Sequence, residues 1–150
     1  MILAGVPPDP AEVTRALASC FRCQPIAAAW LYGSVARGSA RRGSDVDVGV
    51  LFAAHLQTDR RRVLHEIERA LARALPGRKL SVVDLEGAPL LLRHRVLRDG
   101  ALLAEPDPRA RSRFAARVLE SFCATRAVRR TFDNATRYRL AHAVPVVGAM

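Results

Sequence analysis

The pattern of apolar and polar residues predicts helices and strands in alternation along the chain. Short apolar runs predict strands at residues 27–32, 46–52, 80–85 and 101–104. Apolar residues at helical spacing predict helices at about residues 10–20, 35–40, 59–75 and 89–97, and from residue 107 onward. This order favours an α/β fold, with a small mixed β-sheet and helices mainly on one face.

Capping and breaking residues mark the ends of two predicted helices. Asp9 precedes Pro10 and can cap the first helix, because Pro suits the first helical position. Thr58 can cap the long helix that follows the second strand, and the Pro76-Gly77 pair ends it. These signals predict a defined start for the first helix and defined ends for the long helix after the second strand.

The sequence pattern predicts helices and strands only up to about residue 126. We interpret residues 1–126 as one domain and residues 127–150 as a C-terminal tail without assigned structure, because the apolar pattern fades there. Phe114, Val118 and Phe122 share one face of the last predicted helix. That stripe fits the core, or else a surface for a second copy or a protein partner.

Charge and composition narrow the classes of partner. The formal net charge is +10, but the arginines are spread along the chain without interleaved aromatic residues, and Lys79 is the one lysine. Direct nucleic-acid binding is therefore disfavoured, whereas a triphosphate or an acidic protein face fits. The chain has no apolar run long enough to span a membrane and no secretory pattern, so we expect a cytoplasmic protein without a membrane partner.

Two aspartates at alternate positions are the first candidates for chemistry. Asp45 and Asp47 lie at the start of the predicted strand 46–52, where alternate side chains share a face. Two neighbouring carboxylates repel one another unless a cation lies between them. Mg²⁺ prefers such oxygen ligands and takes the rest of its shell from phosphate and water. The pair therefore predicts a metal site.

A glycine and a serine end the preceding strand. A strand that ends at Gly33-Ser34 and turns into a helix presents free backbone N–H groups and a hydroxyl, which suit a phosphate. Arg37, one turn later, is placed for a charge-assisted contact to the same phosphates. This segment predicts a nucleotide-binding turn.

A third carboxylate is expected if the site holds two metal ions, because phosphoryl transfer then needs a further ligand and a proton acceptor. Asp84 ends the third predicted strand, which can lie beside the strand 46–52, and Glu86 is the alternative. We therefore expect Asp45, Asp47 and Asp84 to be the catalytic and metal-binding residues.

Gly33-Ser34, ten further residues and then Asp45-x-Asp47 resemble the DNA polymerase β-type nucleotidyltransferase superfamily. Within it the chain is most similar to the minimal nucleotidyltransferase (MNT) antitoxins of HEPN–MNT toxin–antitoxin pairs. The resemblance implies the family's α/β core, a triphosphate bound by Ser34, and two Mg²⁺ ions. It also implies transfer of AMP from ATP to a tyrosine of a HEPN toxin.

Two alternatives remain open at this stage. The chain fits an antitoxin that neutralises its toxin by binding alone, and it also fits a small-molecule transferase of the aminoglycoside-modifying type. The nucleotide, the acceptor, the number of groups transferred and the oligomeric state are not determined by the sequence.

Overall fold

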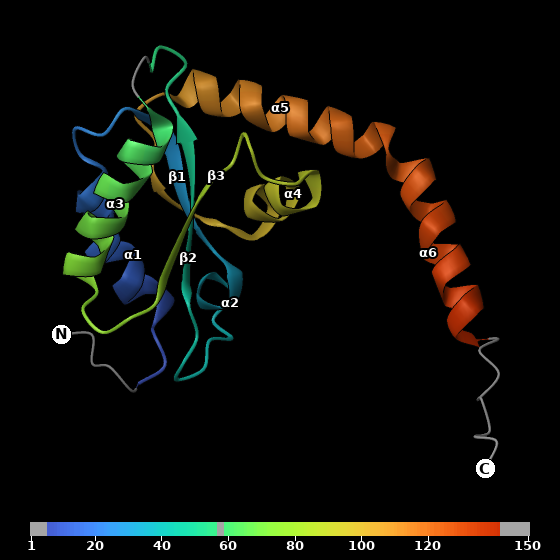
Figure 1. Ribbon diagram of the computed structural model, residues 1–150, viewed down its shortest axis with the longest axis horizontal. Helices are drawn as coiled ribbons and strands as arrows, with labels where there is room; N and C mark the ends of the chain where they lie inside the picture. Colours follow the sequence, from blue (N-terminus) through green and yellow to red (C-terminus); the bar gives the residue numbers. More distant parts are fainter. Residues whose placement is uncertain (1–5, 57–58, 142–150) are drawn as a thin grey trace.

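The protein is built around one four-stranded sheet with the strand order β3-β2-β1-β4 (Figure 1). The computed structural model describes residues 6–56 and 59–141. Strand β1 is antiparallel to both β2 and β4, whereas β2 and β3 run parallel, so the predicted mixed sheet is confirmed. The strands are β1 (Ile26–Tyr32), β2 (Val46–Phe52), β3 (Leu80–Asp84) and β4 (Ala101–Ala104).

The helices follow the predicted order. They are α1 (Pro10–Ala18), α2 (Gly33–Ala36), α3 (Arg60–Ala74), α4 (Leu90–Asp99), α5 (Pro108–Ala124) and α6 (Arg126–Ala141), and a short 3₁₀ turn (Ser19–Phe21) follows α1. Asp9 caps α1, since its carboxylate accepts the Glu12 N–H at 3.1 Å. Asp59 caps α3 by accepting the Arg61 N–H at 2.9 Å, and the predicted cap Thr58 lies outside the described residues.

Helices cover both faces of the sheet rather than mainly one. On one face α1 and α3 bury Leu17 and Ile67 against β1 and β2. On the other, Phe114 of α5 joins Trp30 and Leu51 in a second core (Figure 1). The physical reason lies in the central strands, which are buried at nearly every position. A strand that is apolar on both sides needs cover on both sides.

The last two helices extend beyond the sheet (Figure 1). The predicted stripe on α5 belongs mostly to the core, because Phe114 and Val118 are buried. Phe122 instead stacks on the His94 ring, with 3.6 Å between ring centroids. The chain then continues as α6, where the sequence left residues 127–150 unassigned; residues 142–150 lie outside the described part.

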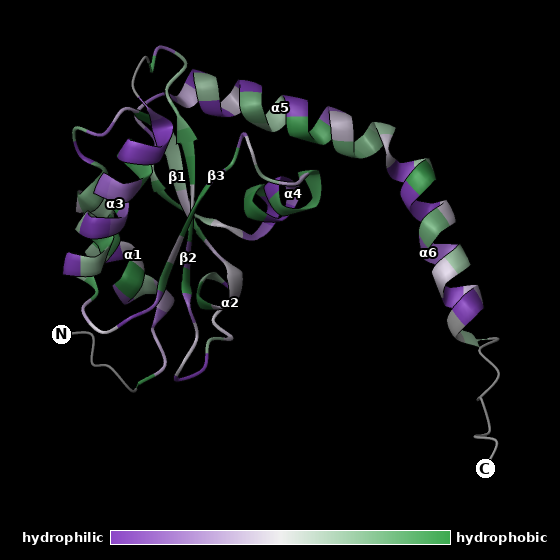
Figure 2. Ribbon diagram, in the orientation of Figure 1, coloured by the Kyte–Doolittle hydropathy of each residue, from purple (hydrophilic) through white to green (hydrophobic). Residues whose placement is uncertain are grey.

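Helix α6 is amphipathic but has little to pack against. Val128, Phe132 and Tyr138 are exposed on it, and polar and apolar residues alternate along its length (Figure 2). Its helical spacing was too weakly supported by capping signals to be predicted. Within residues 6–56 and 59–141, no helix combines the length and apolar character needed to cross a membrane.

Candidate functional site

Two carboxylates lie at the start of the central strand β2. Asp47 is half-buried on the strand and is flanked across the sheet by Tyr32 on β1 and Ser81 on β3. Asp45 immediately precedes the strand and is exposed. Burial, and then the charge of Asp45, raise the pKa of Asp47, and the Arg37 guanidinium opposes this rise. The structure thus brings the predicted pair together, and its mutual repulsion favours a bound cation.

The turn after β1 lies directly against this pair. Gly33 begins α2 with a φ of 76°, a conformation that side chains with a Cβ rarely adopt. A Cβ added there would lie 2.4 Å from Asp47 Oδ2, so only a glycine allows the turn to approach the carboxylate this closely. Ser34 follows within the first turn of α2, whose first backbone N–H groups have no partner inside the helix. The groups predicted to bind phosphate and those predicted to bind metal are therefore neighbours.

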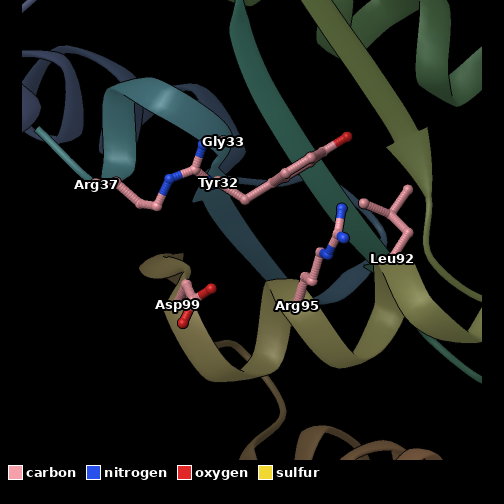
Figure 3. A pocket seen from close by; sticks show the side chains of 6 residues that line it. All are labelled: Tyr32, Gly33, Arg37, Leu92, Arg95 and Asp99. Atoms are coloured by element: carbon pink, nitrogen blue, oxygen red, sulfur yellow. The ribbon is translucent and has the colours of Figure 1, made fainter. Parts of the chain in front are cut away.

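A basic hollow of about 210 Å³ opens beside the turn, between α2 and α4. Its lining is formed by Tyr32, Gly33, Arg37, Leu92, Arg95 and Asp99 (Figure 3). In Figure 3, Arg37 extends from α2 and Arg95 extends from α4 toward the end of β1. These two guanidinium groups suit an anionic ligand that reaches the turn from this side.

Sequence reasoning missed the contribution of α4 to this hollow. Arg95 lies in a helix whose arginines look like an ordinary solvated face, and nothing in its spacing points to the turn 60 residues earlier. Only the packing of α4 on the sheet brings Arg95 and Asp99 to Arg37. Asp99 is itself held by Arg98, whose guanidinium donates to both carboxylate oxygens at 2.8 and 2.7 Å.

Asp84 does not join the pair, contrary to the expectation from element order. It lies in register with Val50, three positions beyond the Asp47–Ser81 pair, and directly paired residues in a parallel sheet share a face. Val50 belongs to the core under α1 and α3, so Asp84 is on the face opposite Asp47. Its carboxylate accepts a hydrogen bond from Arg60 of α3 at 3.2 Å and another from the Glu86 N–H at 3.0 Å.

Glu86, the alternative third carboxylate, is also engaged elsewhere. Its two oxygens lie 2.8 Å from the Arg60 guanidinium and 3.7 Å from that of Arg117. Hydrogen bonds to Glu86 and Asp84 are what raise the pKa of Arg60. These three side chains therefore form an ion-pair cluster that ties β3 to α3, away from the Asp45–Asp47 pair.

With Asp84 and Glu86 paired elsewhere, the carboxylates of Asp45 and Asp47 remain, and these fit one metal ion that binds together with a nucleotide. In the part of the chain that the structure describes, no three His, Cys, Asp or Glu side chains are grouped to hold a metal. Asp45 and Asp47 supply two carboxylates beside the turn at Gly33-Ser34 that is predicted to bind phosphate. Mg²⁺ is commonly held by one or two carboxylates with phosphate and water completing its shell, which this arrangement can provide.

Comparison with known proteins identifies the family to which the chain is similar. Residues 16–109 match the family described as Polymerase beta, Nucleotidyltransferase. A toxin–antitoxin complex with AMP-PNP is similar in structure, with 25% identity, a TM-score of 0.66, and coverage of 83% of this chain and 98% of that one. An MNT antitoxin bound to a tri-AMPylated HEPN toxin, from Shewanella oneidensis, has the same fold, with 22% identity, a TM-score of 0.62, and coverage of 85% and 98%. No curated protein matches the chain.

The family match spans more than half of the chain and includes the turn, the Asp45–Asp47 pair and strand β3. The solved structures show the same arrangement of sheet and helices over almost their whole length. The chain therefore belongs to the polymerase beta nucleotidyltransferase family, and it is a nucleotidyltransferase with the fold of the MNT antitoxins.

Proposed function

We propose that this nucleotidyltransferase binds Mg–ATP and transfers AMP to a protein hydroxyl, a tyrosine of a HEPN toxin, and thereby acts as the antitoxin. The observation that carries the proposal is the close approach of Gly33 to the Asp47 carboxylate, which leaves no room for a Cβ and brings the proposed phosphate-binding turn beside the proposed metal-binding pair. The neighbouring structures support it, because one toxin–antitoxin complex holds AMP-PNP and another contains an AMPylated HEPN toxin.

Each group at the site has a role in binding the nucleotide. Asp45 and Asp47 hold Mg²⁺, which when bound neutralises charge on the phosphate oxygens. The backbone of Gly33 and Ser34, with the Ser34 hydroxyl, positions the phosphates, and Arg37 offsets their charge. The hollow of about 210 Å³ is smaller than a typical pocket for a whole small-molecule ligand, so it takes one part of the nucleotide.

The reaction exchanges the phosphoanhydride bond between the α- and β-phosphates of ATP for a phosphodiester bond to the acceptor. The acceptor oxygen forms a bond to the α-phosphorus of ATP, and the bond from that phosphorus to the bridging oxygen breaks. Pyrophosphate leaves with the bonding electron pair, and the acceptor hydroxyl loses its proton. The protein contributes by orienting the triphosphate and stabilising its developing charge, which are the main sources of rate in such transfers.

The test is to incubate the partner with the enzyme, ATP and Mg²⁺ and to measure the mass of the partner. We expect the partner to gain AMP, with the modified residue a tyrosine. The Asp45→Asn/Asp47→Asn variant is the matched control and should produce no modification. Calorimetry with a non-hydrolysable ATP analogue should show Mg²⁺-dependent binding only to the parent. Binding of equal affinity to parent and variant contradicts the proposed site.

A second candidate function is neutralisation of the toxin by binding alone. The position of Asp84 on the opposite face, paired with Arg60, favours it, because a slow or incomplete transferase can still cover a partner. Growth rescue in cells separates the two functions. Rescue by the Asp45→Asn/Asp47→Asn variant as complete as that by the parent supports binding alone, and loss of rescue supports transfer.

A further inference from the structure

The position beside Asp47 on the neighbouring strand is the place from which a third carboxylate would reach the same metal-binding site. Ser81 is in direct register with Asp47 across the parallel β2–β3 pair, so both side chains leave the same face of the sheet. Adjacent strands lie about 4.8 Å apart, so a short acidic side chain at this position would meet the Asp47 carboxylate.

The other residues around Asp47 cannot take this place. Tyr32 is the neighbour on β1, and it offers a phenol rather than a carboxylate. Asp84 lies three residues further along β3, which is about 10 Å, and leaves the opposite face. Val83, two residues from Ser81 on the same face, is apolar and lies beside Gly49.

We propose that Ser81 stands at the position where a third carboxylate ligand would be needed, so that this site lacks that ligand. Asp45 and Asp47 then hold only the metal ion that binds with the nucleotide. This inference rests on the proposed function and refines it. A neutral serine hydroxyl does not offset the positive charge of a second divalent ion, and it does not accept a proton near neutral pH. The proton of the acceptor hydroxyl therefore passes to water or to a basic group of the acceptor, while the α-phosphorus bond is exchanged as described above.

The chain offers a direct test by substitution. Ser81→Asp places a carboxylate beside Asp47, and Ser81→Asn is the matched neutral control of similar size. The first readout is the number of Mn²⁺ ions bound per chain in the presence of a non-hydrolysable ATP analogue, measured by electron paramagnetic resonance. We expect one ion for the parent and for Ser81→Asn, and two for Ser81→Asp.

The second readout is the rate of pyrophosphate release from Mg–ATP, with water or the partner as acceptor. A correctly placed proton acceptor typically accelerates a reaction by about a hundred- to ten-thousand-fold, so Ser81→Asp should raise the rate by at least about tenfold over Ser81→Asn. Asp84→Asn should leave the parent's rate and its Mn²⁺ count unchanged, because Asp84 faces Arg60.

Two results would overturn the inference. One is a parent that already binds two Mn²⁺ ions and loses one in Asp84→Asn, which can be measured even if Ser81→Asp does not fold. The other is a folded Ser81→Asp chain that still binds one ion and reacts no faster. Neither result touches the proposed function, which fails separately if the parent binds no metal–nucleotide complex at Asp45 and Asp47.

Discussion

Replacing Gly33 by alanine tests the contact on which the site depends. Two costs are expected. A residue with a Cβ at a φ of 76° adopts the left-handed region, which costs about 1–2 kcal/mol. The new Cβ would also lie 2.4 Å from Asp47 Oδ2, so the carboxylate must rotate away, at a further cost of about 0.5–1.5 kcal/mol for an off-rotamer side chain.

The chain contains a matched control for this substitution. Gly38 has a φ of 69°, but a Cβ added to it would meet nothing within 4 Å. Gly38→Ala should therefore lose only the backbone cost of about 1–2 kcal/mol, whereas Gly33→Ala should lose about 1.5–3.5 kcal/mol in the free energy of unfolding. Urea denaturation of the metal-free proteins measures both values.

Nucleotide binding should separate the two variants more clearly than stability does. Displacement of the Asp47 carboxylate would remove a proposed metal ligand, so Gly33→Ala should bind the Mg–ATP analogue at least about tenfold more weakly, equivalent to about 1.4 kcal/mol. Gly38→Ala should bind it with nearly the parent's affinity in the same calorimetric titration. If both variants lose the same stability and the same affinity, the close approach of the turn to Asp47 has no functional role.

Three further predictions concern the Asp47 charge, the Arg37 contact and the core under α5. Because the folded-state pKa of Asp47 is raised above the ordinary 3.8, its charge destabilises the metal-free fold above that raised pKa. Asp47→Asn should therefore raise the free energy of unfolding at pH 7 by less than about 1 kcal/mol, and this gain should vanish below pH 3.8 in urea titrations. A loss of stability at pH 7 would show that neither burial nor the Asp45 charge makes the Asp47 carboxylate unfavourable in the fold. Arg37→Ala should weaken binding of the ATP analogue about tenfold, because one charge-assisted hydrogen bond is lost. Unchanged affinity in calorimetry would mean that Arg37 does not contact the nucleotide. Phe114→Ala should cost about 3–5 kcal/mol, whereas Phe132→Ala, at a side chain 70% exposed in α6, should cost almost nothing; similar denaturation midpoints would mean that α5 does not complete the second core.

Local sequence features were enough to predict most elements of this protein. Capping by Asp9, the apolar runs of the strands and the glycine after β1 act over a few residues, so the boundaries of α1, β2 and β4 were nearly correct. The Asp45–Asp47 pair is equally local, because the two residues are separated by one position at the start of β2, close enough for the charge of Asp45 to raise the pKa of Asp47.

The residue beside Asp47 at the proposed third ligand position could not be predicted, because it depends on the register between β2 and β3, which local sequence signals do not set. A register shift of one residue reverses the face of every side chain, and the pairing of Ser81, rather than Asp84, with Asp47 depends on how β3 aligns beside β2. The same holds for Arg95, which lines the hollow beside Gly33 only because α4 covers the second face of the sheet. The sequence by itself determined the positions of Gly33, Asp45 and Asp47 at the candidate site. The tertiary structure decided that Ser81 and Arg95 are their neighbours, because strand pairing and helix packing are set by contacts between distant segments.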